Sequence, residues 1–159
     1  MSPCPPACDY VELRCRSAFS FLEASSNPED LAAVAAERGH CALALADDNG
    51  LYGIPRFHLA ARAVGLRAIV GATLQVAREE RPGTDALLLL VETPRGYRNL
   101  ARLLTCGHVR AGKEQALVSW SEVEEHASDL TALVRGDARL TPALLDRARA
   151  HFPGRLWAD

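Results

Sequence analysis

Residues 41–53 read CALALADDNGLYG, and this stretch decides how the rest of the chain is organised. Its first six residues are all apolar, a pattern typical of a short strand buried on both faces. Polar residues 47–50 follow at once, and residues 54–64 then show helical spacing that ends at Gly65. The stretch therefore predicts a buried strand, a polar loop and a helix, which together form the first part of a βαβ unit.

The same alternation extends outward in both directions. Further helices are expected to begin after Asn27, Thr93, Ser119 (or Ser121) and Thr141, where a capping residue or a proline at the first helical position favours a start. Further strands are expected at residues 10–15, 68–76, 86–91, 130–134 and 155–158. This order predicts an α/β fold with mainly parallel strands and chemistry at their carboxyl ends. The pattern is compatible with a doubly wound sheet and with part of a barrel.

Composition limits the function classes. The chain has 159 residues, 48% of them hydrophobic and 24% charged, which is an ordinary composition for about one globular domain. A net charge of −2 gives no general attraction for nucleic acid. No apolar run is long enough to span a membrane, so we expect a cytoplasmic protein. Residues 1–9, rich in proline and cysteine, are expected to form a flexible leader.

Two runs place charged residues at predicted strand ends: residues 13–23, LRCRSAFSFLE, and residues 46–53, ADDNGLYG. Because the carboxyl ends of parallel strands share one edge, the charged side chains of both runs should converge there. Residues alone also allow a simpler interpretation. Arg14 and Arg16 alternate with Glu12 as on a solvated strand face, and residues 47–50 have the composition of an ordinary turn.

These runs resemble the polymerase and histidinol phosphatase (PHP) domain at the N-terminus of bacterial C-family DNA polymerases, most closely the error-prone branch. There the first run usually reads L-H-C-H-S-x-F-S-F-L-D-G. Residues 70–74, VGATL, and residues 96–105, GYRNLARLLT, are similar to two more family motifs, the second being specific to the polymerases. The resemblance implies the N-terminal part of a distorted (β/α)7 barrel over residues 10–159. It also implies that the domain is incomplete at its C-terminal end, because residues 154–159 resemble an internal strand.

In the family, His, Asp, Glu and Cys side chains bind up to three metal ions, and active members hydrolyse phosphoesters, including 3′ ends of DNA. Here arginines stand at the first two histidine positions, and only one aspartate keeps its family identity. The degenerate metal-site positions are Arg14, Arg16, Glu23, Asp47, Asp48 and Thr73. Arginine keeps its proton and has no lone pair for a cation. We therefore expect no metal and no catalytic residue, with Arg14 and Arg16 acting as counter-charges for Glu23, Asp47 and Asp48.

The sequence thus predicts a metal-free PHP domain of an error-prone polymerase similar to the DNA polymerase III alpha subunit. Its role would be structural or docking, in damage-tolerant DNA synthesis. The expected partners are the remaining polymerase domains or other DNA synthesis proteins, with DNA contacted indirectly and no membrane involved. The alternative is a phosphoesterase or 3′–5′ exonuclease that keeps Mn²⁺, Mg²⁺ or Zn²⁺ on Glu23, Asp47 and Asp48.

A second group of charges lies on and just after the predicted helix that contains residues 96–105. The group is Arg95, Arg98, Arg102 and Arg110. Such a group is usually a solvated helix face, and contact with DNA or with a neighbouring polymerase domain is the alternative.

Overall fold

The computed structural model describes residues 10–78, 82–111, 116–136 and 140–158. The predicted leader, residues 1–9, lies outside these ranges. The chain divides into two compact units, Met1–Gly71 and Ala72–Asp159, and strand β3 (Arg67–Ala77) contributes to both. The strands follow one another in the sheet in chain order, β1 to β6. Within the described residues, no helix is both long enough and apolar enough to cross a membrane.

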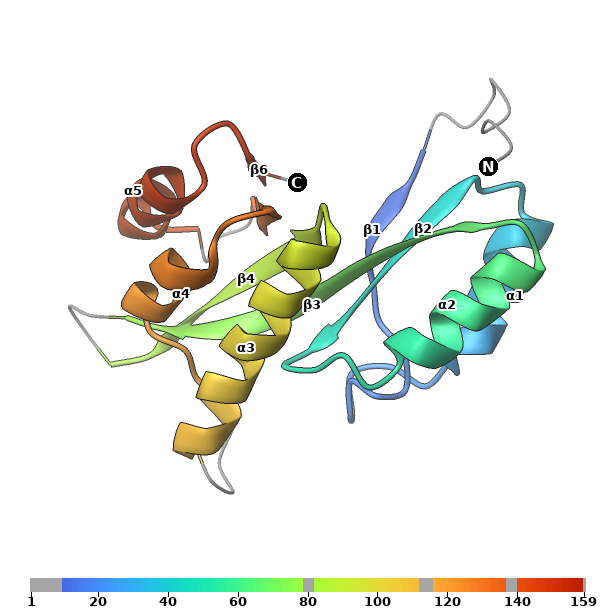
Figure 1. The fold of residues 1–159 in the computed structure, drawn as a ribbon, viewed down its shortest axis with the longest axis horizontal. Helices are drawn as coiled ribbons and strands as arrows, with labels where there is room; N and C mark the ends of the chain where they lie inside the picture. Colours follow the sequence, from blue (N-terminus) through green and yellow to red (C-terminus); the bar gives the residue numbers. More distant parts are fainter. Residues whose placement is uncertain (1–9, 79–81, 112–115, 137–139, 159) are drawn as a thin grey trace. The chain divides into compact units, whose positions relative to one another are not determined.

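The first unit is a β-α-β-α unit that leads into β3 (Figure 1). Its elements are β1 (Glu12–Cys15), α1 (Pro28–Glu37), β2 (Ala42–Asp48) and α2 (Ile54–Ala63). Strands β1 and β2 pair in parallel, with Cys15 opposite Leu45. The helices pack against each other, and their buried faces close over β2 in a core that includes Phe57, Leu43 and Leu45. This core fixes where β1 and β2 end.

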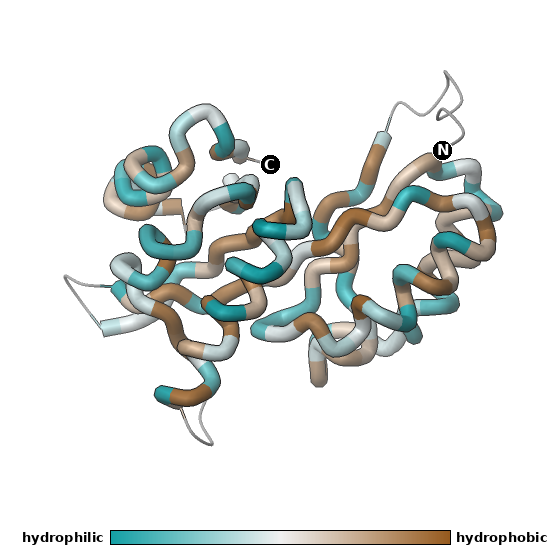
Figure 2. Tube along the Cα trace, viewed as in Figure 1, coloured by the Kyte–Doolittle hydropathy of each residue, from teal (hydrophilic) through white to brown (hydrophobic). Residues whose placement is uncertain are grey.

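The second unit continues from β3 through β4 (Thr84–Val91) to α3 (Pro94–Ala111) and α4 (Trp120–His126). It ends with β5 (Leu130–Val134), α5 (Pro142–His151) and β6 (Leu156–Ala158). The strands carry the most hydrophobic stretches, including the buried leucines of β4, whereas the helices alternate hydrophobic and hydrophilic residues (Figure 2). Each helix therefore buries one face and exposes the other.

The predicted α/β class with mainly parallel strands is confirmed, and one strand direction differs from a fully parallel sheet. β5 and β6 are parallel, but β4 runs antiparallel to β5. The physical reason is the connection between β3 and β4, which are neighbours in the sheet joined only by residues 78–83. A parallel crossover needs a dozen or more residues, so two neighbouring strands separated by so few residues are expected to be antiparallel.

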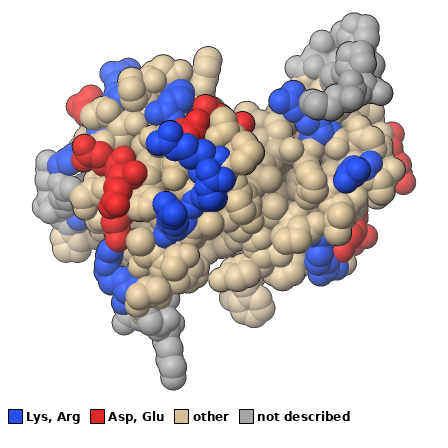
Figure 3. Space-filling model, in the orientation of Figure 1, with Lys and Arg blue, Asp and Glu red and all other residues tan. Residues whose placement is uncertain are grey.

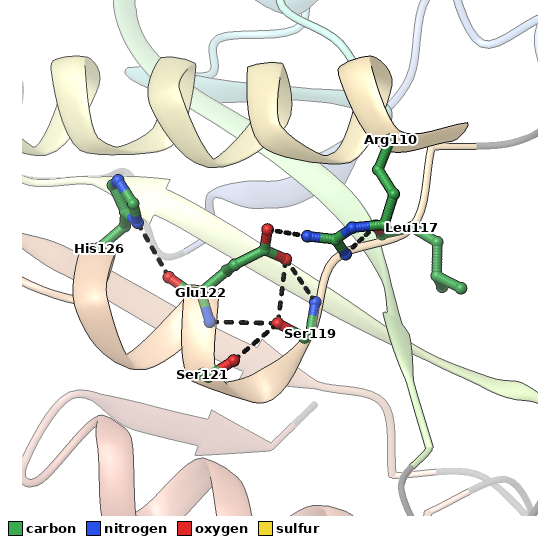
Figure 4. Close-up of polar contacts among 6 residues, drawn as sticks. All are labelled: Arg110, Leu117, Ser119, Ser121, Glu122 and His126. Carbon is green, nitrogen blue, oxygen red and sulfur yellow. Dashed lines mark hydrogen bonds and ion pairs between the residues drawn. The ribbon is translucent and has the colours of Figure 1, made fainter. Parts of the chain in front are cut away.

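The junction between α3 and α4 is held by a network of polar contacts (Figure 4). Ser119 and Glu122 form a capping box at the start of α4, with the Ser119 main-chain nitrogen donating to Glu122 Oε2 at 2.8 Å. The Arg110 guanidinium, near the end of α3, bonds the Glu122 carboxylate and donates to the Leu117 carbonyl oxygen at 3.4 Å. Ser119 is therefore the cap of α4, as the sequence indicated, and Arg110 fastens α3 to it.

Candidate functional site at the ends of β1 and β2

Asp47, near the end of β2, is the buried centre of the site, with only 1% of its surface exposed. Its Oδ1 accepts hydrogen bonds from the Ser17 main-chain nitrogen and from Ser20 Oγ, each at 2.7 Å. Its Oδ2 accepts one from Ser17 Oγ, also at 2.7 Å. A buried carboxylate is stable only when such donors replace its hydration. Both oxygens are thus already engaged by the loop that follows β1.

That loop, residues 16–27, is folded around the same two serines. The Ser20 main-chain nitrogen donates to the Ser17 carbonyl oxygen at 2.8 Å, and the Glu23 main-chain nitrogen donates to the Ser20 carbonyl oxygen at 2.9 Å. Ser20 Oγ also accepts a hydrogen bond from the Asp48 main-chain nitrogen at 3.1 Å. The loop is therefore fastened to β2 by side chains that the sequence analysis did not single out. The signal that would have found them is a pair of hydroxyls three residues apart within residues 13–23, the run that was expected to converge with Asp47.

Arg16 lies between two carboxylates at the edge of this loop. Its Nη1 is 3.4 Å from Glu23 Oε2, and its Nη2 is 3.2 Å from Asp48 Oδ1. The Arg16 and Asp48 side chains are 32% and 26% exposed, so water still screens the pairs and each contributes modestly to stability. One guanidinium is thus close enough to both carboxylates to offset part of their negative charge.

Asp48 holds its proton more tightly than an ordinary aspartate. Burial raises its pKa from the usual value, the Arg16 charge opposes this rise, and the Glu23 and Asp47 carboxylates add to it. Asp47 and Asp48 are neighbours at the end of β2, but alternation along a strand sends their side chains to opposite faces. The strand thus separates a structural carboxylate from one that faces Arg16.

Cys15, the last residue of β1, is a half-buried free cysteine. Burial, together with the nearby Glu12 and Asp47 carboxylates, raises the pKa of its thiol to about 11, although a hydrogen bond with the Arg16 backbone lowers it in part. The thiol is therefore protonated at neutral pH. A protonated thiol is neither a good nucleophile nor a metal ligand.

The rim of the site is apolar and closely packed against Gly53. A Cβ added at Gly53 would lie 3.0 Å from Asp47 Oδ2 and 3.1 Å from the Phe19 ring. The Phe19 ring also contacts Tyr52, with ring centroids 6.5 Å apart, and the Arg56 guanidinium lies 5.9 Å from its centroid. Glycine at position 53 lets the β2–α2 loop close over the buried carboxylate.

The structure thus brings together Arg16, Glu23, Asp47 and Asp48 of the predicted positions. Arg14 lies half-buried in β1, where its main-chain nitrogen donates to Glu12 Oε1 at 2.6 Å. Thr73 is buried in the part of β3 that belongs to the second unit. Across the described ranges, no group of three or more His, Cys, Asp or Glu side chains is arranged to hold a metal ion.

Residues 12–152 match the PHP domain family, and the chain belongs to that family. It is 55% identical over 104 residues to the error-prone DNA polymerase of Anaeromyxobacter sp. (strain K), a match that covers 65% of this chain and 9% of the polymerase. It is 42% identical over 164 residues to the error-prone DNA polymerase of Bordetella parapertussis, covering 93% of this chain and 15% of the polymerase. The resemblance predicted from the motifs is confirmed, and the chain spans only a small fraction of these relatives.

Solved structures show the same fold at low sequence identity. One is a protein of Bifidobacterium adolescentis assigned as a metal-dependent phosphoesterase, with a TM-score of 0.71, 12% identity, and coverage of 95% of this chain and 77% of that one. Another is an amidohydrolase from Chromobacterium violaceum, with a TM-score of 0.60, 15% identity, and coverage of 92% and 75%. At these identities the likeness establishes the fold.

Proposed function

We propose that this chain is a degenerate, metal-free PHP domain of an error-prone C-family DNA polymerase, with a structural or docking role in damage-tolerant DNA synthesis. The names and lengths of its curated relatives support a place within a larger polymerase. Its partners would then be the remaining polymerase domains or other DNA synthesis proteins. Because DNA synthesis in bacteria takes place in the cytoplasm, the proposed location of the protein is cytoplasmic.

The observation that carries the proposal is the position of the Arg16 guanidinium between Glu23 and Asp48. In metal-dependent phosphoester hydrolysis, cations neutralise clustered carboxylates and lower the pKa of a bound water. A guanidinium neutralises carboxylates but has no site for a water ligand. The site therefore keeps the charge balance of its family while losing the chemistry.

The donor set does not fit the metal centre that the family implies. Asp47 directs both oxygens at Ser17 and Ser20, and Arg16 already contacts Asp48. A cation at this place would have to displace hydrogen bonds to a buried carboxylate and lie beside a permanent positive charge. What remains is a closed polar network that holds the 16–27 loop in shape.

A metal titration of one variant tests the proposal directly. In Arg16→Gln, the Glu23 and Asp48 carboxylates lose their counter-charge, so we expect millimolar Mn²⁺ to raise the melting temperature of the variant and not that of the unaltered chain. Arg56→Gln, which removes a guanidinium paired with Glu29, is the matched control and should behave like the unaltered chain. Stoichiometric Mn²⁺, Zn²⁺ or Fe in the purified unaltered chain, measured by elemental analysis, would contradict the proposal.

The alternative enzymatic function has its own assay. The chain is incubated with Mn²⁺ and p-nitrophenyl phosphate or a labelled 3′ DNA end, with and without chelator. We expect no turnover above background. Chelator-sensitive turnover that disappears in Asp48→Ala would instead establish a reduced phosphoesterase site.

The place of the chain in a polymerase is tested separately, by immunoblot of the native host with an antibody against this segment. A band several times larger than 17.2 kDa is expected. A band near that mass would show a free-standing PHP protein and would contradict the polymerase part of the proposal.

A further inference from the structure

The outer face of α3 carries a row of arginines that the site at β1 and β2 does not involve. The helix has 18 residues, including Arg95, Arg98, Arg102 and Arg110, and it contains no aspartate or glutamate. Its buried face is formed by Gly96, Leu100, Leu103, Leu104 and Gly107. At 100° per residue, positions 95, 98 and 102 fall together on the opposite side. We call Arg95, Arg98 and Arg102 the α3 arginine stripe.

The charges of the stripe are largely unneutralised. Arg95 is paired with Asp129 at 3.5 Å, while its side chain remains 67% exposed. Arg98 and Arg102 are exposed, and among the residues that the structure describes neither has an ion pair. Arg110 is not part of the stripe because its guanidinium is turned to Glu122 and the Leu117 carbonyl. The stripe therefore presents positive charge to solvent.

Charge is also segregated around the stripe. Basic side chains gather over the α3 side of the second unit, and acidic side chains lie beside them (Figure 3). Exposed glutamates of the neighbouring helix α4, Glu124 and Glu125, contribute acidic charge next to α3. The whole chain carries a net charge of −2, so this basic surface is local. A flexible polyanion would be attracted along α3 and repelled from α4.

The dimensions and donor type of the stripe match a phosphate backbone. Arg95 and Arg102 are seven residues apart, or about 10 Å along the helix at 1.5 Å per residue. A row of this length can contact more than one phosphate of the same strand, because phosphates follow one another closely along the backbone. Guanidinium groups bind phosphate oxygens in a bidentate fashion. A row of such groups fits backbone contact that is independent of base sequence.

From these observations we propose that the α3 arginine stripe binds the phosphate backbone of DNA. The stripe and its charge follow from the second unit alone, whereas the choice of DNA as the polyanion rests on the proposed function. The contact would be electrostatic and therefore strongly dependent on salt.

Fluorescence anisotropy with labelled single-stranded and duplex oligonucleotides tests this, using the full 159-residue chain between about 50 and 200 mM salt. Arg98→Gln/Arg102→Gln should weaken binding by about tenfold at the lowest salt. It should also reduce the slope of log K against log salt by about 1.4 for single strands, as expected for two lost phosphate contacts. Arg98→Lys/Arg102→Lys keeps the charges and should retain most of the slope.

The matched control is Arg38→Gln/Arg62→Gln, which removes the same charge from exposed positions of the first unit. It should leave the affinity within about twofold of the unaltered chain and the salt slope unchanged. Equal loss in both double variants would show general charge attraction and overturn the proposal, as would no binding at the lowest salt. Circular dichroism melts confirm that each variant is folded.

Two further outcomes separate this inference from the proposed function. If polyglutamate at equal charge displaces DNA as well as unlabelled DNA does, the stripe recognises an acidic protein segment and the DNA assignment is wrong. The metal titration of Arg16→Gln and the immunoblot do not involve the stripe. Either proposal can therefore fail while the other stands.

Discussion

The two charged regions of this protein differ in whether their charged side chains are paired within the protein or exposed to solvent. At the ends of β1 and β2, the Asp47 carboxylate is buried under serine donors, and Arg16 serves both Glu23 and Asp48. On α3, in the part of the chain that the structure describes, Arg98 and Arg102 have no carboxylate partner. Charged side chains that are paired with each other hold the 16–27 loop in place and leave few free donors or acceptors for a ligand. Charges left in solvent are free to bind one.

The predicted metal-site positions and the proposed DNA-binding surface therefore lie in different regions of the chain. Arg16, Glu23, Asp47 and Asp48, four of the predicted metal-site positions, lie in a polar network with Ser17 and Ser20. The exposed arginines lie on α3, the helix that contains the polymerase-like run of residues 96–105. Substitutions should therefore disturb stability at the first region and binding at the second.

Removal of the buried carboxylate should have the largest effect. Asp47→Ala leaves the Ser17 and Ser20 donors buried without an acceptor, at about 1 to 3 kcal/mol for each unsatisfied group. We expect a loss of about 3 to 5 kcal/mol of unfolding free energy, which thermal or urea denaturation would measure. Asp146→Ala, an exposed aspartate on α5, is the control. A loss of similar size in the control would show that burial of Asp47 does not make it more important for stability than an exposed aspartate.

Gly96→Ala tests the packing of the arginine helix. A Cβ at Gly96 would lie 2.0 Å from the Asp129 carbonyl oxygen, a main-chain atom that can move only with its loop. We expect a loss of about 2 to 3 kcal/mol, measured by urea denaturation. Helix propensity alone predicts a gain of up to about 1 kcal/mol for this change, so a more stable variant would contradict the close contact.

Gly53→Ala should have a smaller effect at the first region. The added methyl group would press on Asp47 Oδ2, Ser17 Oγ and the Phe19 ring at 3.0 to 3.1 Å, and all three belong to side chains that can shift slightly. Gly53 has φ of −77°, so alanine brings no backbone strain. We expect a loss of about 1 kcal/mol in the same denaturation experiment. A loss as large as that of Gly96→Ala would mean that the network cannot adjust.

Asp48→Asn should change how the melting temperature depends on pH. Because the pKa of Asp48 is raised in the folded protein, its proton stabilises the fold at low pH, and this contribution is lost as pH rises through the folded pKa. Asparagine mimics the protonated form. The variant should melt slightly above the unaltered chain at pH 7, by less than about 3 °C, and the difference should vanish below about pH 3.5. A variant less stable at pH 7 would show that the Arg16 pair outweighs burial.

The smallest change in stability is expected at the stripe. Arg98→Gln/Arg102→Gln changes two exposed side chains that have no ion pair within the described residues, so the unfolding free energy should stay within about 0.5 kcal/mol of the original. This holds although the same variant should lose most DNA affinity. A large loss of stability would show that these arginines have a structural role, and the two charged regions would then not differ in function.

Much of the fold could be predicted because local patterns specify it. The apolar run of residues 41–46 and the helix that begins at Ile54 were recognisable from their periodicity and from the glycine at position 65. Two local details differ. Asp47 and Asp48 belong to β2 rather than to a turn, and the Asn27 side chain donates to Asp30 instead of capping α1. Both depend on competition between local and sheet hydrogen bonds, which composition does not settle.

Residue type and spacing were enough to predict the order of strands and helices and the family, and they place arginines, which have no lone pair to donate, at positions 14 and 16. Three sets of contacts arise only in the folded chain: Ser17 and Ser20 with Asp47, Arg16 with Glu23 and Asp48, and Gly96 with Asp129. The serine and aspartate lie about thirty residues apart in the chain. Their contact arises when β1 and β2 pair and bring their ends to one edge, so the site depends on packing that no local stretch encodes.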